Sequence, residues 1–289
     1  MVDALGTLKL GLPKGRMQEG VFQLLHEAGV SVKVGARGYR PTLPVRWLEA
    51  KILKPQNIVE MLEAGSRDVG FAGADWVDEL GAHLVELLDT GLDPVRLVAA
   101  APSELVQASW PPKRRIVVAS EYERLTRAWI EKKGLDASFL RSYGATEVFP
   151  PEDADCIVDN AATGSTLKAN QLEIVDELML SSTRLYANKA AYHDPTRRPL
   201  IDRLVLLVRS VLEARRRVMV ELNVAADRLE AVVRVLPAMR EPTISPLHGG
   251  QGYAVKVAVQ RSELPDLIPE IKNQGGSDIV VSVLSQIVP

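Results

Sequence analysis

The chain has 289 residues, of which 46% are hydrophobic and 25% charged, a composition typical of a folded globular protein with two or three domains. Its net charge of −2 gives no indication of a nucleic-acid partner or an acidic membrane surface, and no apolar run approaches the length of a membrane span. A single cysteine, Cys156, excludes an intramolecular disulfide, and the N-terminus lacks a secretory signal pattern, so we expect a cytoplasmic protein.

The first third of the chain alternates between apolar strands and amphipathic helices. The pattern predicts a strand at 8–12, a basic turn at 13–16 and a helix that ends at Gly29. A second helix around 58–65 then precedes a strand at 68–73. This order of strand, turn and helix favours a mainly parallel α/β sheet.

Prolines near residues 102 and 111 indicate that a second α/β unit begins there. Its expected elements are, in order, a strand at 116–119, a helix ending at Gly134 and strands at 138–140 and 156–158. A strand at 184–187 is then expected to return toward the first unit and to be followed by a long helix over 201–212. Two α/β units joined by crossover segments are expected to bind ligands in the cleft between them.

The last part of the chain has the predicted order βαββαβ, which is typical of a ferredoxin-like fold. Its expected strands cover 218–222, 243–245, 254–259 and 279–283, and its expected helices cover 229–236 and 264–271. A module of this size is small for a catalytic domain, so we expect it to serve small-molecule regulation or subunit contact.

The stretch 159–172 combines an acid at a strand end, hydroxyl side chains around a glycine and the start of a helix. Free N–H groups at a helix N-terminus attract phosphate, and the glycine lets the backbone approach it closely. The hydroxyls add donors, and the acid can accept hydrogen bonds from sugar hydroxyls. The stretch therefore predicts a site for a phosphorylated sugar, although an ordinary strand–turn–helix connection with a capping threonine has the same pattern. The site residues predicted here are Asp159, Thr163, Gly164, Ser165 and Thr166.

Three further segments offer polar groups at strand or turn ends. Lys14 and Arg16 flank a glycine after the first strand and either hold a polyphosphate or form a solvated basic turn. Gly73 permits close backbone approach, and Asp75 either accepts from a purine amino group or caps the next helix. Glu147 offers a carboxylate for ligand hydroxyls or a magnesium-bound water, or is a plain surface residue. No nucleophilic triad or zinc-type spacing is evident, so we assign no catalytic group and no protein metal site.

Together these segments resemble the long form of ATP phosphoribosyltransferase, the first enzyme of histidine biosynthesis. The resemblance covers almost the whole chain, and its most specific part is the pattern Asp-x-x-x-Thr-Gly-x-Thr-Leu-x-x-Asn-x-Leu at 159–172. The other parts are Leu12–Arg16, Asp68–Asp75 and Pro242–Leu247.

The resemblance implies a reaction in which N1 of the adenine of ATP attacks C1 of phosphoribosyl pyrophosphate (PRPP), with Mg²⁺ required. On this basis we assign the 5′-phosphate of PRPP to Thr163–Thr166 and its ribose hydroxyls to Asp159. The residues assigned to ATP or to the departing pyrophosphate are Lys14, Arg16, Gly73, Asp75 and Glu147.

The resemblance also implies an architecture. Two periplasmic-binding-protein-like α/β lobes are expected at 1–102 with 184–213 and at 103–183, followed by an ACT-like βαββαβ domain at 214–289. That last domain is expected to bind histidine as a feedback inhibitor. Long-form members assemble as dimers and hexamers, so we expect a homo-oligomer without nucleic-acid or membrane partners. The candidate histidine contacts are Thr243, Ser245 and Leu247.

Two departures from the family pattern affect side chains. Lys54-Pro55-Gln56-Asn57 stands where the family usually has Arg-Pro-x-Asp, and Asn160 and Ala162 replace a usual apolar residue and a usual Glu or Ser. Because the phosphate loop relies on backbone N–H groups, we expect it to remain functional. Two alternatives stay open: a non-catalytic two-lobed binding protein with the same fold, and a short-form subunit that needs a histidyl-tRNA-synthetase-like partner. The extra C-terminal domain disfavours the second.

Overall fold

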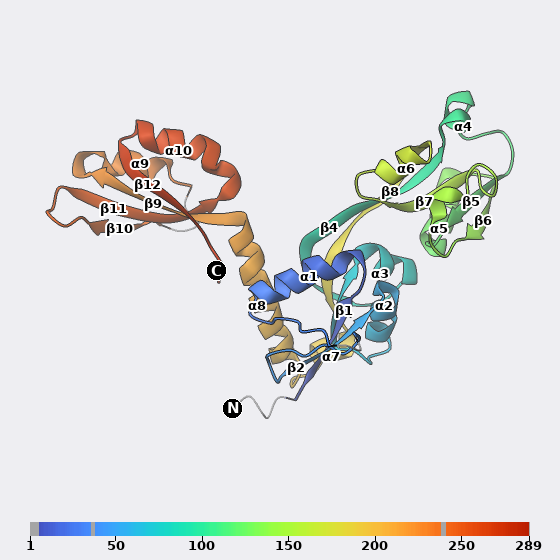
Figure 1. The fold of residues 1–289 in the computed structure, drawn as a ribbon, viewed down its shortest axis with the longest axis horizontal. Helices are drawn as coiled ribbons and strands as arrows, with labels where there is room; N and C mark the ends of the chain where they lie inside the picture. The colour runs from blue at the N-terminus through green and yellow to red at the C-terminus, as the bar shows by residue number, and fades with distance from the viewer. Residues whose placement is uncertain (1–5, 36–37, 238–240, 289) are drawn as a thin grey trace. The chain divides into compact units, whose positions relative to one another are not determined.

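The protein folds into two compact units. The first contains the described residues of Met1–Gln23 and Val32–Asp202, and the second those of Leu24–Ser31 and Arg203–Pro289. An eight-stranded sheet lies in the first unit and a four-stranded sheet in the second (Figure 1). The computed structural model describes residues 6–35, 38–237 and 241–288.

The first lobe of the larger sheet repeats a strand followed by a helix three times. In β1 (Leu8–Pro13), three leucines are buried, and the strand pairs in parallel with its two neighbours, as strands joined by helical crossovers do. The strands and helices predicted at 8–12, 16–29, 58–65 and 68–73 are confirmed. The other elements of this lobe are α1 (Arg16–Glu27), β2 (Leu48–Leu53), α2 (Pro55–Glu63), β3 (Val69–Gly73) and α3 (Ala74–Leu80).

The second lobe has the same kind of core. Its central strand β5 (Ile116–Ser120) pairs in parallel with β6 (Ala137–Arg141) and β7 (Cys156–Ala161), and the lone cysteine is buried. The helix start predicted within 159–172 is found after the glycine loop, where a short helix begins at Ser165 and ends at Ala169. The helices of this lobe are α4 (Ser103–Ala108), α5 (Glu123–Lys133), the short 3₁₀ helix η1 (Thr146–Val148) and α6 (Ser165–Ala169).

Two long antiparallel strands join the lobes into one mixed sheet. The strands β4 (Val85–Pro102) and β8 (Leu172–Ala187) pair along their length, and the strand order is β2-β1-β3-β8-β4-β7-β5-β6. The sequence predicted only the end of β8, at 184–187, and missed β4. Several register shifts interrupt the pairing, and β4 contains Gly91 and Pro94, which obscure the period of a strand. The two-lobed α/β fold is confirmed, whereas the lobe boundaries stay a prediction.

The lobes also touch through α3 and α5. Glu79 of α3 is buried, and its carboxyl oxygens accept hydrogen bonds from the backbone N–H groups of Arg124 and Leu125, each at 3.0 Å. These groups lie in the first turn of α5, where N–H groups have no acceptor within the helix. A carboxylate is also favoured at the positive end of the helix dipole. Glu79 thus caps a helix of the opposite lobe and holds the two lobes together.

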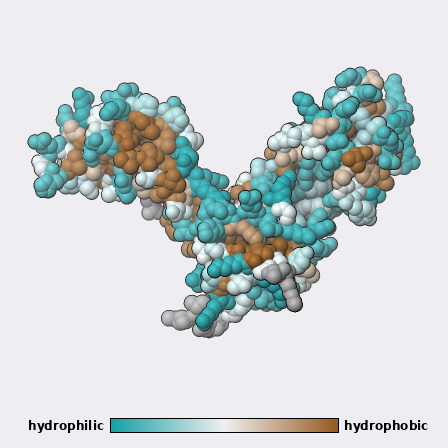
Figure 2. All heavy atoms as spheres, in the orientation of Figure 1, coloured by the Kyte–Doolittle hydropathy of each residue, from teal (hydrophilic) through white to brown (hydrophobic). Residues whose placement is uncertain are grey.

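The C-terminal unit has the predicted ferredoxin-like order of elements. Its sheet order is β10-β11-β9-β12 with all pairings antiparallel. The core consists of buried valine, leucine and isoleucine side chains from the sheet and both helices. Figure 2 shows apolar atoms gathered on the surface of this unit among its helices and sheet. Its elements are β9 (Arg217–Ala225), η2 (Ala226–Arg228), α9 (Leu229–Val235), β10 (Thr243–Pro246), β11 (Gly252–Gln260), η3 (Arg261–Glu263), α10 (Leu264–Asn273) and β12 (Gly276–Val283).

Two helices, α7 (Lys189–His193) and α8 (Arg198–Arg216), occupy the chain between β8 and β9. The long helix predicted over 201–212 is therefore confirmed. Among the described residues, none of the helices combines the length and the apolar character that crossing a membrane requires.

Candidate active site

The loop after β7 forms a cavity of about 330 Å³, which we call the loop cavity. All five residues that the sequence predicted for a sugar phosphate line it, from Asp159 to Thr166. Glu147, carried by η1, and Arg16, from the start of α1, line it as well. The structure thus brings together one acid from a separate segment and one cation from the other lobe around the predicted loop.

The backbone of this loop has the form that a phosphate site needs. Gly164 stands at the N-cap of α6 with φ of +75°, in the left-handed region that favours glycine. The hydroxyl of Thr163 accepts from the N–H of Ser165 at 3.3 Å, so this threonine turns the loop but does not cap the helix. No side chain caps α6, and apart from that of Ser165, which donates to Thr163, its first-turn N–H groups are available at the cavity end of the helix.

Asp159 is the acid at the end of β7, and its environment is unusual. Burial, together with the carboxyls of Glu147 and Glu121, raises the pKa of Asp159 to about 6. Hydrogen bonds from the N–H of Asn160, at 2.7 Å, and from the hydroxyl of Thr146 oppose this rise in pKa. With this pKa the carboxyl is largely ionised at pH 7, and the neighbouring acids favour its contact with a cation or a donor group.

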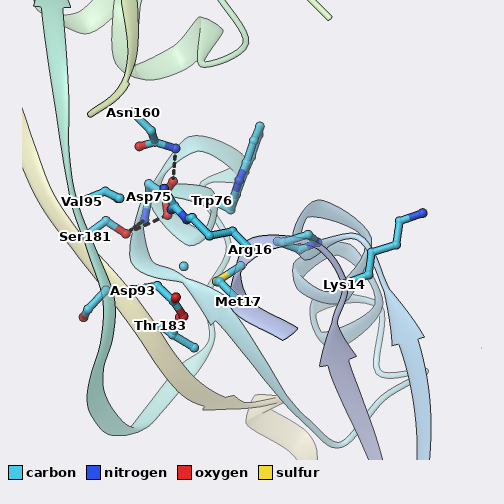
Figure 3. A pocket seen from close by; sticks show the side chains of 13 residues that line it. Lys14, Arg16, Met17, Asp75, Trp76, Asp93, Val95, Asn160, Ser181 and Thr183 are labelled. Carbon is cyan, nitrogen blue, oxygen red and sulfur yellow. Dashed lines mark hydrogen bonds between the residues drawn. The ribbon is translucent and has the colours of Figure 1, made fainter. Parts of the chain in front are cut away.

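A second cavity of about 270 Å³, which we call the Asp75 cavity, lies beside the first. It is lined by Gly73 and Asp75 from the first lobe and by residues of both long strands. Arg16 and Asn160 line both cavities. Figure 3 shows that Arg16 reaches toward Asp75, whereas Lys14 points away from it. The ammonium of Lys14 lies 5.9 Å from the ring centre of the exposed Tyr39.

Asp75 is buried and its two carboxyl oxygens are already hydrogen-bonded. One accepts from the hydroxyl of Ser181 at 2.8 Å, and the other accepts from the hydroxyl of Tyr122 at 2.7 Å and from the amide of Asn160 at 3.2 Å. Gly73, at the N-cap of α3, makes room for this arrangement, because a Cβ there would lie 2.1 Å from an Asp75 oxygen. The roles of Gly73 and Asp75 toward a nucleotide stay a prediction.

Several residues of this cluster were not predicted from the sequence. Tyr122 and Asn160 belong to the second lobe, Ser181 to β8, and the ring of Trp76 stacks on that of Tyr122 with centroids 4.5 Å apart. The amide of Asn160 also donates to the hydroxyl of Tyr122. Of these residues, only Asn160 stood out in the sequence, because it departs from the family pattern. Its side-chain amide donates to Asp75 in the structure. The pKa of Tyr122 is raised by burial and by the Asp75 carboxylate, so its hydroxyl stays protonated and donates.

The segment Lys54–Asn57, which differs from the usual family pattern, contributes one residue to the Asp75 cavity. Pro55, in the first turn of α2, lines this cavity, and Lys54 is the N-cap residue. The amide of Asn57 donates to Glu60 within the helix at 3.1 Å. The structure therefore gives Asn57 a local role in α2.

The predicted histidine contacts lie in the C-terminal unit. Thr243 and Ser245 are exposed on β10, an edge strand that pairs with β11, and the N–H of Leu247 donates to the carbonyl of Gly252 at 2.9 Å. The three residues follow one another along the edge of the sheet. Their role in binding histidine stays a prediction.

A sequence model of the ATP phosphoribosyltransferase family matches residues 54–210, and a model of its C-terminal domain matches 214–286. The chain is 37% identical to the ATP phosphoribosyltransferase of Pelotomaculum thermopropionicum, over 98% of this chain and 99% of that protein. It is also 37% identical to the enzyme of Chlorobium phaeovibrioides, over 96% and 97% of the two chains.

Among solved structures, the chain is similar to one described as the ATP phosphoribosyl transferase (HisG:HisZ) complex from Thermotoga maritima. The match has a TM-score of 0.62 and 26% identity and covers 70% of this chain and 99% of that one. By sequence over nearly its full length and by fold, this chain belongs to the ATP phosphoribosyltransferase family, whose members are pentosyltransferases.

Proposed function

We propose that this protein condenses ATP with PRPP to give phosphoribosyl-ATP and pyrophosphate, the first step of histidine biosynthesis. The observation that carries the proposal is the pair of adjoining cavities that share Arg16 and Asn160. PRPP occupies the loop cavity, with its 5′-phosphate on the Thr163–Thr166 loop and its ribose hydroxyls on Asp159. ATP occupies the Asp75 cavity, so that the two substrates meet at the shared wall.

The chemistry follows from this placement. The bond between C1 of PRPP and the pyrophosphate oxygen breaks, its electron pair leaves with pyrophosphate, and N1 of adenine forms the new bond to C1. Positive charge develops at C1 and negative charge on the leaving group, so the site acts through positioning and electrostatics. Arg16 is the cation that faces both cavities, and it stabilises the departing pyrophosphate.

We propose that Mg²⁺ enters bound to the pyrophosphate group of PRPP. Among the described residues, no three His, Cys, Asp or Glu side chains come together as a metal site. Mg²⁺ commonly binds to substrate phosphates and one or two carboxylates, and the carboxyls of Asp159 and Glu147 in the loop cavity fit that pattern. Glu147 would contact it through a bound water, and the ion would neutralise charge on the leaving group.

The proposal is tested by mixing the protein with ATP, PRPP and Mg²⁺ and measuring phosphoribosyl-ATP and pyrophosphate by mass spectrometry. We expect both products in equal amounts, and neither when any one component is left out. Binding of PRPP without either product, across pH values and Mg²⁺ concentrations, would favour the non-catalytic binding protein instead.

We also propose that histidine inhibits the enzyme through the C-terminal domain and that the protein forms a homo-oligomer. The edge strand β12 supports the proposed homo-oligomer. Its side chains Val280, Val281 and Val283 are exposed, and an open sheet edge can pair with another copy of the chain. In the full-length protein, Thr243→Ala and Ser245→Ala should weaken inhibition by histidine and leave the uninhibited rate unchanged. Unaltered inhibition in both variants would contradict the assignment of these contacts.

A further inference from the structure

Asp93 has an unusual backbone conformation at a bend of β4. Its φ is +49°, in the left-handed region, which asparagine and aspartate tolerate better than most residues other than glycine. The pairing of β4 with β8 shifts register before it, between Asp89 and Leu92, and again across it, between Leu92 and Val95. Irregularities of this kind redirect a side chain out of the regular alternation of a strand and are frequent beside active sites.

The bend directs Asp93 into the wall of the Asp75 cavity, beside Thr183 (Figure 3). One carboxyl oxygen, Oδ2, accepts from the hydroxyl of Thr183 at 2.9 Å. The other oxygen, Oδ1, accepts no hydrogen bond from the described residues. The contrast with Asp75 is clear, because the carboxyl of Asp75 accepts three hydrogen bonds from protein side chains. Of the two acids in this cavity, Asp93 is the one with free acceptor capacity.

The charges around the cavity restrict what Asp93 can receive. The cations that line it are Lys14 and Arg16, and they suit a polyphosphate. A carboxylate repels phosphate oxygens and only accepts hydrogen bonds, so a group of ATP itself that contacts Asp93 must be a neutral donor. ATP carries neutral donors only in its nucleoside part, namely the ribose hydroxyls and the exocyclic amino group of adenine.

We propose that Asp93 is a specificity-determining residue that accepts a hydrogen bond from a neutral donor of the nucleoside part of ATP. The proposal rests on the function proposed above, since it requires ATP in the Asp75 cavity. Thr183 orients the carboxyl through one oxygen and leaves the other for the ligand. The left-handed backbone, which glycine would adopt more easily, is retained because the site uses this carboxyl.

The test measures the affinity for ATP by titration and the KM values for both substrates in Asp93→Asn and Asp93→Gly. Asparagine keeps the shape and tolerates the backbone, and glycine relieves the backbone while removing the side chain. We expect the affinity for ATP to fall at least tenfold in both variants, as for the loss of a hydrogen bond to a charged group, and the KM for PRPP to stay unchanged. The matched control is Asp89→Asn, an acid of the same bend that lies outside this cavity and accepts from Gly91 and Ser182.

Analogues of ATP identify the donor. In competition titrations, 2′-deoxy-ATP and 3′-deoxy-ATP each lack one ribose hydroxyl, and inosine triphosphate lacks the amino group. The analogue that lacks the donor should bind wild type and Asp93→Asn equally, whereas the other analogues should keep the full difference. An undiminished difference for all three analogues would overturn the proposal.

Equal affinity of wild type and Asp93→Asn for ATP would overturn the assignment of Asp93 while leaving the proposed function intact. A raised Mg²⁺ requirement with unchanged ATP affinity would also overturn it, because Asp93 would then serve the metal. Failure of the proposed function is recognised separately, by the absence of phosphoribosyl-ATP with the wild-type protein, and it would overturn this proposal as well.

Discussion

The two cavities of the catalytic unit use their polar groups in opposite ways. In the Asp75 cavity, the central carboxyl is buried and its oxygens accept from Ser181, Tyr122 and Asn160. In the loop cavity, Thr163 and its neighbours are exposed, and the helix end that they form has no side-chain cap. The first cavity is therefore held rigid by internal hydrogen bonds, whereas in the second the uncapped helix end keeps N–H groups beyond Ser165 available for an anion.

The difference shows how one site can combine a rigid framework with a loop that is accessible to a ligand. The Asp75 cluster joins residues of the two lobes and β8, and Glu79 adds a second link between the lobes. These links fix the position of the loop cavity relative to Arg16. The N–H donors of the loop that lack a protein acceptor form hydrogen bonds with phosphate oxygens when the ligand binds, and these bonds contribute to the binding free energy.

Among these variants, Gly73→Ala in the Asp75 cavity should cause the largest loss of stability and activity. The new Cβ would lie 2.1 Å from the Asp75 oxygen, so the carboxyl must leave its three donors. We expect a loss of about 3 kcal/mol in the free energy of unfolding and a severe loss of activity. Gly35→Ala is the matched control, because its Cβ meets nothing within 4 Å. Denaturant unfolding that is unchanged in Gly73→Ala would contradict the rigid role of this cluster.

Gly164→Ala tests the loop cavity through substrate binding, whereas Gly73→Ala tests the Asp75 cavity through stability. Its Cβ would meet nothing within 4 Å, but φ is +75°, so alanine is strained there by about 1 kcal/mol and the loop backbone should shift. We expect the KM for PRPP to rise at least tenfold with a small change in the melting temperature. Gly134→Ala has similar strain, with φ of +63°, at the end of α5, and should leave that KM unchanged. Equal KM values in the two variants would show that loop geometry is not what binds PRPP.

The pKa of Asp159 predicts a pH dependence with a definite sign. Because the folded value, about 6, lies above the usual value near 4, the protonated carboxyl stabilises the fold below pH ~4, and this stability is lost as the pH rises through ~6. Asp159→Asn, which stays neutral, should be more stable than wild type at pH 7 by roughly 1–3 kcal/mol, and the difference should vanish near pH 4.

The same change should weaken PRPP binding, because the ionised Asp159 accepts from the ribose hydroxyls. In wild type, the affinity for PRPP should therefore fall as the pH drops through about 6. Asp155→Asn serves as a control of opposite sign, since the neighbouring Arg114 lowers the pKa of Asp155 and its loss should destabilise the fold at pH 7. An Asp159→Asn variant less stable than wild type at pH 7 would contradict this account.

The smallest effect is expected for Thr166→Ala, which removes one hydroxyl from the loop and leaves its backbone N–H groups in place. The KM for PRPP should rise about threefold to tenfold, as for one neutral hydrogen bond, with no change in the KM for ATP. Steady-state kinetics with each substrate varied in turn measures both. A KM for PRPP that does not rise would contradict the assignment of the Thr166 hydroxyl to the phosphate site.

Local signals predicted much of this fold and part of this site. The strands and helices on either side of each turn follow from apolar periodicity, and the loop from Asp159 to Thr166 was found because its residues are contiguous. The long strands β4 and β8 were missed or shortened because bulges and Pro94 interrupt their alternation. The Asp75 cluster was out of reach for a different reason. Its hydrogen-bonded partners are 38 to 106 residues apart in the chain, and only the folded sheet brings them together.

The contrast between the two cavities is tested most directly by a crystal structure of the protein with Mg²⁺ and PRPP bound. The account predicts the 5′-phosphate within hydrogen-bond distance, about 2.7–3.2 Å, of backbone N–H groups of the Gly164–Thr166 turn, with the Asp75 hydrogen bonds unchanged. PRPP bound instead in the Asp75 cavity, or an Asp75 carboxyl released from Tyr122 and Ser181 to reach it, would contradict the account.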